Sequence, residues 1–276
     1  MNRRLALPGR LVLLGHPVAH SLSPAFQNAA LESAGIALRY EALDVAPAEL
    51  AQALRDLGSV GGAGNVTIPH KRAVHDACDA LSAVARRAGA VNTFWHEAGT
   101  LCGDNTDVAG FEQAAAGLGV QRPGARVVLL GAGGAAAAVC AAVELWPGAA
   151  VRIVARNADR ARALARSFPD LVVLPRDATE ALKGASLVVN ATPIGMHGTA
   201  VPLSTDELPG DADVMDLVYR AGETTWVRDA RARGLRAADG REMLLQQGAA
   251  AFSRWFGRAP DLVAMRLALV RASELG

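Results

Sequence analysis

The chain has 276 residues, 51% of them hydrophobic, and a formal net charge of +1 at pH 7. This length suits two domains of ordinary size, and the apolar content can fill a core in each, so we expect a folded globular protein. The near-zero charge offers no field to attract nucleic acid or anionic lipid, and aromatic residues, at 4%, leave little surface for stacking bases. These numbers argue against a protein that binds nucleic acid.

Strand and helix patterns alternate along the first part of the chain. The helix at 23–35 begins with a serine and Pro24, as a capped helix does, and ends at a glycine. The expected strands are at 10–15, 39–45 and 61–68, with a hairpin at 89–105 and helices at 23–35, 47–58, just after 68, and 107–119.

The second part of the chain repeats the alternation, and the Gly and Pro residues of 119–125 suggest a domain connection before it. Two helical stretches follow residues 236–243 and run to the end. Alternating short apolar strands and helices predict an α/β fold with parallel sheets and crossover helices. The apolar strands are expected within 125–134, 149–157, 171–174, 186–192 and 213–219.

Two apolar stretches could be mistaken for membrane signals. The run at 11–15 is too short for the core of a signal peptide, and the run at 127–143 is interrupted by a Gly-Ala-Gly-Gly turn. We interpret the first as a buried strand and the second as strand, turn and helix, and we expect no membrane partner.

The three cysteines, Cys78, Cys102 and Cys140, are widely spaced and form no CxxC pattern. Their odd number and spacing argue against a disulfide framework and a zinc site. Free thiols suit a reducing compartment, so we predict a cytoplasmic protein without a bound metal.

A glycine-rich turn follows the strand expected near 127–130. It fits the G-x-G-x-x-A pattern of a dinucleotide site, in which backbone amides approach a pyrophosphate at a helix N-terminus. The alternative is an alanine-rich helix packed tightly on a sheet. The predicted cofactor residues here are Gly131, Ala132, Gly133, Gly134 and Ala135.

The next strand end favours NADP over NAD. Arg156 stands where an NAD enzyme usually has an acid, and Arg160 follows in the first turn of a helix. Two guanidinium groups can bind a 2′-phosphate. Asn157 joins this predicted site and also suits the helix cap. The alternative is that Asp159 binds the ribose, although the helix dipole explains an acid there.

Lys71 is conspicuous because the chain almost avoids lysine. Only Lys71 and Lys183 are lysines among 28 basic residues. Arginine stays charged, whereas a lysine amine can be adjusted to exchange a proton, so Lys71 is a candidate for chemistry. The alternative is a solvated lysine at the start of a helix.

Seven motifs occur in order along the chain: GHPVAHSLSPAFQNAAL, GNVTIPHK, AVNT, GDNTDVAGF, GAGGAA, NATPIGM and DGREMLLQQGAAAFSRW. Together they resemble the shikimate dehydrogenase family, and the resemblance covers most of the chain. It implies an N-terminal α/β substrate domain (1–108 with 241–276), a Rossmann-like NADP-binding domain (109–240), and a cleft between them.

The resemblance also implies the substrate residues. Ser21 and Ser23 would hold the substrate carboxylate beside a helix N-terminus, unless one of them is only the helix cap. Thr67, Asn92 and Gln247 would bind ring hydroxyls and help to position the carboxylate end. Gln246 is an alternative to Gln247, and Asn65 is expected to brace a loop.

Lys71 and Asp107 would form the catalytic pair and would also contact the substrate. Hydride transfer to or from a secondary alcohol requires a group that removes or supplies the hydroxyl proton, and a lysine near a carboxylate can share that task. The alternative for Asp107 is the cap of the helix at 107–119.

The remaining cofactor residues implied by the resemblance are Thr192 and Pro193, near the nicotinamide half, and Gly240, near the nicotinamide amide. Tyr219 would border the cleft, and Ala221 stands where the family commonly has proline. His20 and His70 lie inside motifs without an assigned role.

The implied function is the NADP-dependent, reversible reduction of 3-dehydroshikimate to shikimate in aromatic amino-acid biosynthesis, by a monomer or homodimer. A quinate/shikimate or aminoshikimate dehydrogenase differs by only a few pocket contacts and stays open as an alternative. A non-catalytic dinucleotide-binding regulator on the same fold is a third. Retention of the whole set of polar site residues argues against that regulator.

Overall fold

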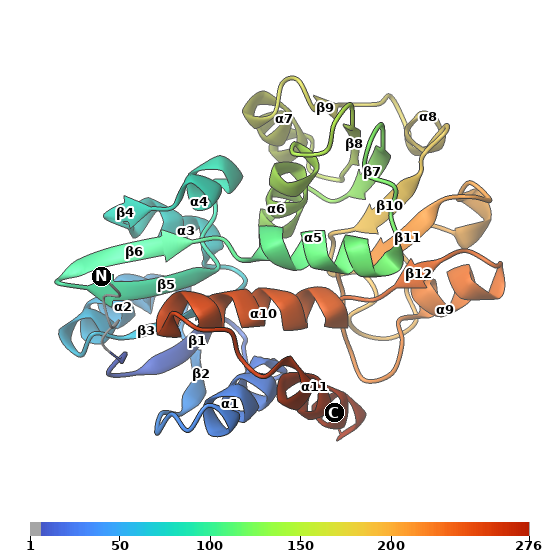
Figure 1. Ribbon diagram of the computed structural model, residues 1–276. Helices are drawn as coiled ribbons and strands as arrows, with labels where there is room; N and C mark the ends of the chain where they lie inside the picture. The colour runs from blue at the N-terminus through green and yellow to red at the C-terminus, as the bar shows by residue number, and fades with distance from the viewer. Residues whose placement is uncertain (1–6, 276) are drawn as a thin grey trace. The chain divides into compact units, whose positions relative to one another are not determined.

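The computed structural model describes residues 7–275 and divides the chain into two compact units, one built from residues up to Gly110 and from Leu244 onward, the other from Phe111–Met243 (Figure 1). The predicted limits, 108/109 and 240/241, lie two and three residues from these divisions. Both divisions fall inside helices, α5 (Asp107–Leu118) and α10 (Arg241–Phe256).

The domain connection predicted at 119–125 was wrong, because that segment lies inside the second unit. Gly119 ends α5 with a φ of 78°, and the backbone N–H of Val120 donates to the carbonyl of Ala115. Gly and Pro here mark a helix end and a turn rather than a boundary between units.

The first unit contains a six-stranded mixed sheet. Its strands are β1 (Leu11–Gly15), β2 (Tyr40–Asp44), β3 (Ala63–Val66), β4 (Ala80–Leu81), β5 (Thr93–Glu97) and β6 (Thr100–Asp104). Their order is β2-β1-β3-β5-β6-β4. β1 pairs in parallel with β2 and β3, whereas β5 is antiparallel to both β3 and β6.

The helices of this unit follow the predicted pattern. Besides most of α10, they are α1 (Ser23–Ser33), the 3₁₀ turn η1 (Pro47–Glu49), α2 (Leu50–Ser59), α3 (Lys71–Ala77), α4 (Ala83–Ala88) and α11 (Leu262–Leu275). Helix α1 packs against α11. Val12, Phe94 and Leu57 are buried in one apolar cluster, which joins the sheet to α2.

The predicted hairpin is β5 and β6. Glu97 pairs with Thr100, so the loop is Ala98 and Gly99, with φ of 51° and 80°. A two-residue loop with positive φ at both positions is the turn that matches the twist of paired strands. This hairpin reverses the chain and returns the end of β6 to the edge where β3 ends.

The second unit contains a fully parallel six-stranded sheet in the order β12-β11-β10-β7-β8-β9. The strands are β7 (Arg126–Leu130), β8 (Ala150–Val154), β9 (Val172–Val173), β10 (Leu187–Asn190), β11 (Asp213–Asp216) and β12 (Ala237–Ala238). The helices are α6 (Gly134–Val143), α7 (Ala158–Ser167), α8 (Ala178–Leu182), η2 (Thr205–Glu207) and α9 (Thr225–Ala232).

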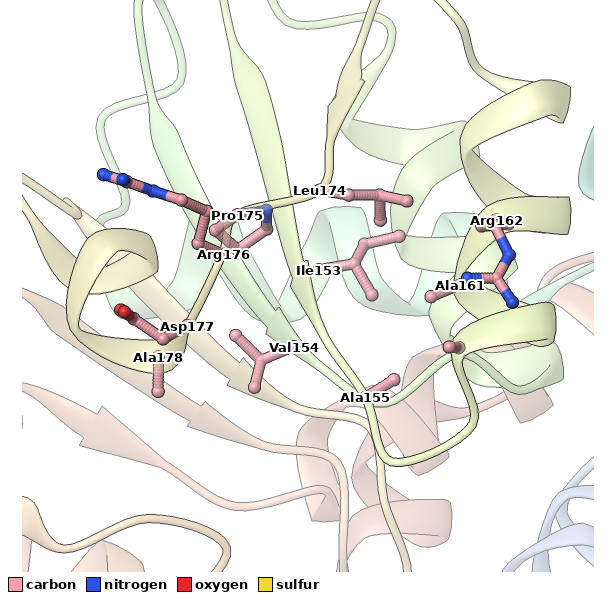
Figure 2. Close-up of a pocket in the computed structure, with 11 residues that line it drawn as sticks. Ile153, Val154, Ala155, Ala161, Arg162, Leu174, Pro175, Arg176, Asp177 and Ala178 are labelled. Atoms are coloured by element: carbon pink, nitrogen blue, oxygen red, sulfur yellow. The ribbon is translucent and has the colours of Figure 1, made fainter.

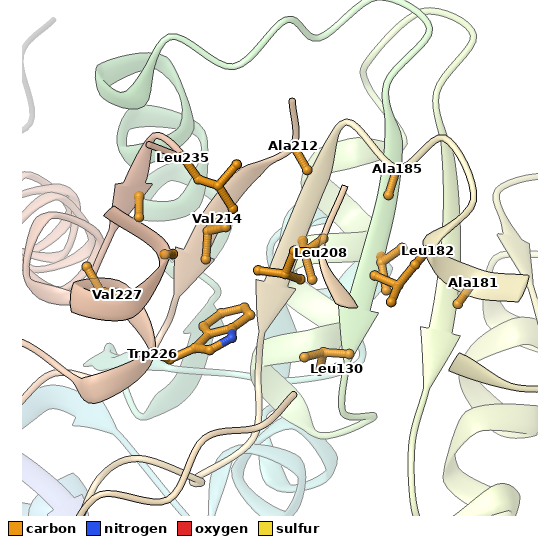
Figure 3. Packing of buried hydrophobic residues seen from close by; sticks show 14 residues of the cluster. Leu130, Ala181, Leu182, Ala185, Leu208, Ala212, Val214, Trp226, Val227 and Leu235 are labelled. Carbon is orange, nitrogen blue, oxygen red and sulfur yellow. The ribbon is translucent and has the colours of Figure 1, made fainter. Parts of the chain in front are cut away.

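A core cluster fills one face of this sheet (Figure 3). Val128 and Leu130 of β7 alternate with residues of the opposite face and meet Leu182 of α8 and Trp226 of α9. All four side chains are at most 6% exposed. Burial on both faces explains the near-continuous apolar run of β7. The two sheets with their helices confirm the predicted α/β class.

Three local features differ from the expectation. The two-residue strands β4 and β12 were not predicted, because so short a run carries no periodicity. Helix α1 has Leu22 at the N-cap without a side-chain cap, and Ser23 is already helical. The N–H of Ser23 instead donates to Ser21 Oγ at 3.2 Å.

Within residues 7–275, no helix is both long and apolar enough to cross a membrane.

Candidate active site

The candidate catalytic residues meet at one edge of the first unit's sheet. Asn65 of β3 pairs with Thr93 of β5, and Thr93 pairs with Asp104 of β6. The antiparallel pairing therefore places the end of β3, the start of β5 and the end of β6 together. Helices α3 and α5 begin just after this edge, with Lys71 and Asp107 as their first residues.

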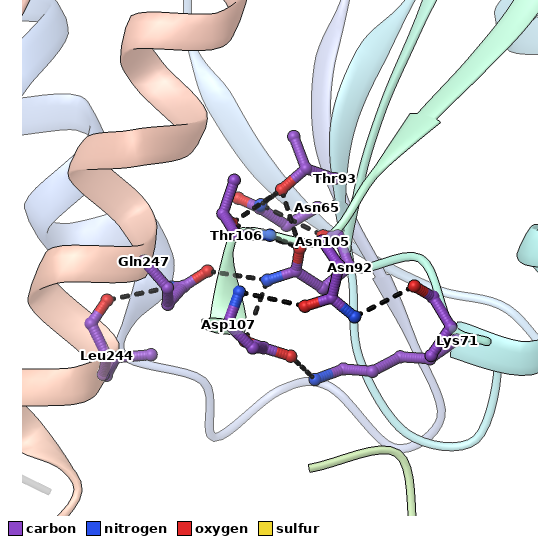
Figure 4. Close-up of polar contacts among 10 residues, drawn as sticks. Asn65, Lys71, Asn92, Thr93, Asn105, Thr106, Asp107, Leu244 and Gln247 are labelled. Carbon is purple, nitrogen blue, oxygen red and sulfur yellow. Dashed lines mark hydrogen bonds and ion pairs between the residues drawn. The ribbon is translucent and has the colours of Figure 1, made fainter. Parts of the chain in front are cut away.

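The predicted pair of Lys71 and Asp107 is in direct contact (Figure 4). The distance from Lys71 Nζ to Asp107 Oδ2 is 2.5 Å, and the side chains are 18% and 8% exposed. Lysine at this position is thus not a solvated surface residue. Its side chain is largely buried, and its amine contacts a carboxylate.

Asn105, rather than Asp107, completes the start of helix α5. The backbone N–H of Asp107 donates to Asn105 Oδ1 at 3.1 Å, and Asn105 Nδ2 donates to the carbonyl of Ala90 at 2.9 Å. The Asp107 carboxylate is therefore available for side-chain contacts. Sequence reasoning missed Asn105, although an Asn two residues before a helix is a usual signal for this bond.

Asn92 organises the site through five hydrogen bonds. Its Nδ2 donates to Asp107 Oδ1 at 2.8 Å and to Gln247 Oε1 at 3.2 Å. Its Oδ1 accepts from the backbone N–H of Thr106 at 2.7 Å and from the hydroxyls of Thr93 and Thr106. At 2% exposure, Asn92 has both of its N–H donors engaged by protein groups. Its structural role as a hub was not predicted.

Gln247 is the better-placed of the two candidate glutamines. It is 7% exposed, it accepts from Asn92, and its Nε2 donates to the carbonyl of Leu244 at 2.8 Å. An amide nitrogen has two N–H donors, and within residues 7–275 only one of them is engaged. The second is available to a ligand.

Asn65 and His70 support the site without entering it. Asn65 Nδ2 donates to the carbonyl of Asn92 and to Thr93 Oγ1, and Asn65 Oδ1 accepts from the hydroxyl of Tyr40. His70 is 1% exposed, and its Nε2 lies 2.7 Å from the carbonyl of Val45. For Asn65 this bracing role matches the expectation, whereas His70 had been left without a role.

The remaining predicted substrate residues follow β1 and β3, which are neighbours in the sheet. Thr67 directly follows β3, is half-buried, and donates its N–H to the carbonyl of Leu14. Ser23 is buried and Ser21 half-buried at the start of α1. Among residues 7–275, no hydrogen bond joins these three hydroxyls to Lys71 or Asp107, so the structure does not link them to the pair.

The second unit carries the glycine-rich turn between β7 and α6. Gly131 has a φ of +112°, and a Cβ there would lie 2.9 Å from the carbonyl oxygen of Ala191, so the position requires glycine. Gly133 is the N-cap of α6 without a side-chain cap, and a Cβ added to it would meet nothing within 4 Å. With Ala132 before it and Gly134 and Ala135 opening α6, the turn leaves backbone donors uncovered by side chains, as an anion site requires.

The predicted 2′-phosphate residues lie on exposed surface at the end of β8. Asn157 caps α7 by accepting from the N–H of Arg160 at 3.0 Å. Arg156 and Arg160 are exposed, and within the described part of the chain neither guanidinium has an ion pair. Asp159 instead pairs with Arg162 at 2.7 Å. Asp159, the alternative candidate for binding the ribose, is therefore engaged in an ion pair.

A cavity of about 280 Å³ lies at the carboxyl ends of β8 and β9 (Figure 2). Ile153 and Leu174 extend from neighbouring strands toward α7, and Arg162 stands on that helix. Arg156 and Arg160 do not line this cavity. Its lining combines apolar side chains with the charged residues Arg162, Arg176 and Asp177.

Three further predicted cofactor residues follow β10 and β12. Thr192 donates both its N–H and its hydroxyl to Asn190 Oδ1, at 3.0 and 2.7 Å, and Pro193 next to it is exposed. Gly240 is buried, and a Cβ on it would lie 2.4 Å from the carbonyl oxygen of Leu217. Close packing of two backbones alone explains this glycine.

Neither a disulfide nor a metal cluster is present within residues 7–275. Cys78, Cys102 and Cys140 are thiols that no disulfide joins, and burial raises the pKa of Cys78 to about 12. In that range no group of three His, Cys, Asp or Glu side chains is placed to hold a metal ion.

Comparison with known proteins gives two family-model matches, which lie almost entirely in the first unit, and relatives that match nearly the whole chain. A family model described as the shikimate dehydrogenase substrate binding domain matches residues 13–94, and one described as the shikimate 5'-dehydrogenase C-terminal domain matches residues 240–269. The chain is 47% identical over 274 residues to shikimate dehydrogenase (NADP(+)) of Methylocella silvestris, and the match covers 95% of this chain and 96% of that protein.

Further relatives agree. The chain is 41% identical over 281 residues to shikimate dehydrogenase (NADP(+)) of Symbiobacterium thermophilum, covering 97% of this chain and 96% of that protein. The crystal structure of shikimate 5-dehydrogenase from Thermus thermophilus in complex with NADP(H) and shikimate has a TM-score of 0.87 and 40% identity. The match covers 95% of this chain and 99% of that chain. The similarity thus spans nearly the whole sequence.

Proposed function

The chain belongs to the shikimate dehydrogenase family, and on that premise we propose that it catalyses the NADP-dependent, reversible reduction of 3-dehydroshikimate to shikimate. The observation that carries the proposal is the contact of Lys71 with Asp107, held in place by Asn92. A secondary alcohol gives up a proton and a hydride when it becomes a ketone, and this pair is built to handle the proton.

Lys71 exchanges the proton with the substrate oxygen. The Lys71 side chain is more exposed than that of Asp107, 18% against 8%, so we assign the exchange with the substrate to Lys71. In the reduction, Lys71 donates a proton to the ketone oxygen; in the oxidation, it accepts the hydroxyl proton. Asp107 accepts a hydrogen bond from Lys71 Nζ at 2.5 Å and so orients the amine, and Asn92 donates to the other carboxylate oxygen.

The polar residues around the pair orient the substrate. Gln247, with one N–H donor available, binds a ring hydroxyl beside Asp107. Thr67 approaches from the end of β3, and Ser21 and Ser23 receive the carboxylate at the N-terminus of α1, an 11-residue helix whose N-cap side chain makes no hydrogen bond. Both N–H donors of Asn92 are engaged, one by Asp107 and one by Gln247. Asn92 can therefore donate to a ring hydroxyl only if one of these two hydrogen bonds breaks.

The second unit has the features that NADP requires. The start of α6 at Gly133 and Gly134 has no side-chain cap and suits the pyrophosphate, whereas the N–H of Gly131 donates to the carbonyl of Val154. The exposed guanidinium groups of Arg156 and Arg160 suit the 2′-phosphate. NADP held by these residues would supply the hydride acceptor for the oxidation and, as NADPH, the hydride donor for the reduction. No observation favours quinate or an aminated analogue as the substrate. A non-catalytic dinucleotide-binding regulator would have no need for the contact of Lys71 with Asp107.

The setting of the reaction follows the same premise. From the proposed reaction we expect an enzyme of aromatic amino-acid biosynthesis. We expect it in the cytoplasm, because cysteines kept as thiols suit a reducing compartment. A monomer or a homodimer is compatible with a site whose catalytic pair and supporting amides all come from one chain.

A steady-state assay tests the proposal. The purified protein is incubated with shikimate, with quinate or without either, each with NADP⁺ and with NAD⁺, and reduced nicotinamide is followed by absorbance. Rapid turnover only with shikimate and NADP⁺ is expected. Faster turnover of quinate than of shikimate would identify the protein as a quinate dehydrogenase instead. No turnover in any combination would contradict the proposal of a dehydrogenase of this class.

A further inference from the structure

A buried carboxylate that the proposed reaction does not use lies in the second unit. Asp216, the last residue of β11, is 1% exposed. Its Oδ1 accepts from Asn190 Nδ2 at 2.8 Å and from the backbone N–H of Val218 at 3.0 Å, and its Oδ2 accepts from the hydroxyl of Thr224 at 2.8 Å.

Neutral groups alone donate to this carboxylate. Among residues 7–275, no lysine, arginine or histidine pairs with Asp216, and burial raises its pKa, with the carboxylate of Asp239 acting in the same direction. Asp213, three residues earlier on the same strand, pairs through both oxygens with Arg236 at 2.7 Å. Burying a charge against neutral donors alone is costly, and within residues 7–275 no cationic side chain offsets that cost for Asp216. What the carboxylate provides is one common acceptor for three buried donors.

The three donors belong to three separate segments. Asn190 ends β10, and its side chain also binds Thr192 through Oδ1 and the carbonyl of Ile194 through Nδ2. Val218 begins the loop after β11, and its carbonyl accepts from the N–H of Gly240. Thr224 caps α9. One carboxylate thus fixes residues 190–194 and 217–218 relative to each other.

The sheet order places these loops under one half of the dinucleotide. The pyrophosphate site follows β7, and Arg156 for the adenosine half follows β8. β10 and β11 lie on the opposite side of β7 from β8. A dinucleotide that crosses the carboxyl end of β7 therefore extends its nicotinamide half over the loops after β10 and β11.

We propose that Asp216 is a positioning residue for the nicotinamide half of NADP, acting by holding the loops after β10 and β11 through Asn190 and Val218. The inference rests on the proposed function. It predicts a selective effect, because the adenosine half lies on the other side of β7 and does not depend on these loops.

Calorimetric titration of the full chain with NADP⁺ and with 2′,5′-ADP, which lacks the nicotinamide half, tests this assignment. Asp216→Ala is expected to weaken NADP⁺ binding about tenfold, the loss of roughly one hydrogen-bonded contact, and to change 2′,5′-ADP binding less than about twofold. Asp216→Asn keeps an oxygen for Asn190 and Val218, so it is expected to recover most of the NADP⁺ affinity.

Asp213→Asn serves as the matched control, because it alters a buried carboxylate on the same strand that is paired with Arg236. It is expected to leave both affinities unchanged. Equal weakening of both ligands by Asp216→Ala, or no change in either, overturns the assignment. Should Asp216→Ala not fold, Asn190→Ala decides, because it cuts the same link at its other end: a loss of affinity for NADP⁺ but not for 2′,5′-ADP supports the role, and equal loss for both ligands or no change in either overturns it. Failure of the unmodified protein to bind either ligand would instead contradict the proposed function.

Discussion

The two units each hold a buried polar network beside the ends of their strands, and the networks differ in one respect. The network around Asn92 includes a cation, Lys71, that is 18% exposed and touches a carboxylate. Within residues 7–275, the network around Asp216 contains no cation, and its three side chains, Asn190, Asp216 and Thr224, are at most 1% exposed. Under the proposed function, the network that exchanges a proton keeps a titratable side chain partly exposed, whereas the side chains of the network that fixes backbone are fully buried.

Of the changes considered, replacing Lys71 should lower turnover most, without a matching loss of stability. Lys71→Ala is expected to lower kcat about 10²–10⁴-fold, because the proton donor to the ketone is lost, with little change in KM for shikimate. Steady-state kinetics measures the effect. Lys183→Ala, at the other lysine of the chain, which is exposed, is the matched control and should leave kcat unchanged. Near-normal turnover in Lys71→Ala would remove this residue from the mechanism.

Removing the hub of the first network should damage both stability and activity. Asn92→Ala leaves the buried N–H of Thr106 and one oxygen of Asp107 without their partner, which costs roughly 1–3 kcal/mol for each unsatisfied group. We expect the free energy of unfolding to fall by that order, and kcat/KM to fall about tenfold or more as Asp107 and Gln247 lose support.

Denaturant unfolding and steady-state kinetics measure these two effects. Asn28→Ala is a suitable control, because Asn28 also makes two hydrogen bonds, to the backbone of Tyr40. It should lower stability without lowering kcat. A loss of stability in Asn92→Ala with full catalytic efficiency would mean that this network only supports the fold.

Changing the arginines of the second unit should affect cofactor choice alone. The double change Arg156→Ala with Arg160→Ala is expected to raise KM for NADP⁺ about tenfold or more, because charge-assisted bonds to the 2′-phosphate are lost, and to leave KM for NAD⁺ nearly unchanged. Arg162→Ala should change neither constant beyond about twofold, since its exposed ion pair with Asp159 contributes little. Equal damage with both cofactors would show that the arginines are misassigned.

Features set by local sequence were predictable. The strands at β7 and β8, the Ala98-Gly99 hairpin and the glycine turn at Gly131 follow from periodicity and from conformations that few residues adopt. The nomination of Lys71 followed from its rarity, and its contact with Asp107, across 36 positions of sequence, matched the family pattern.

Features set by side chains that meet only after folding were missed. Asn92 contacts Gln247 across 155 positions, and Asp216 contacts Asn190 across 26, so no local pattern reveals either network. The capping role at α5 belongs to Asn105 rather than to Asp107 because hydrogen-bond geometry, and not residue type, distinguishes two nearby candidates. The two-residue strand β12 depends on pairing with β11 for its existence.

The most direct test of the central claim is a double-mutant cycle on kcat/KM for shikimate with Lys71→Ala, Asp107→Ala and the two changes together. If the two residues act as one proton-transfer unit, the double variant should be no more than about twofold worse than the less active single variant. Losses that multiply, so that the double variant falls by the product of the single effects, would show that the two residues act independently and would contradict the shared role.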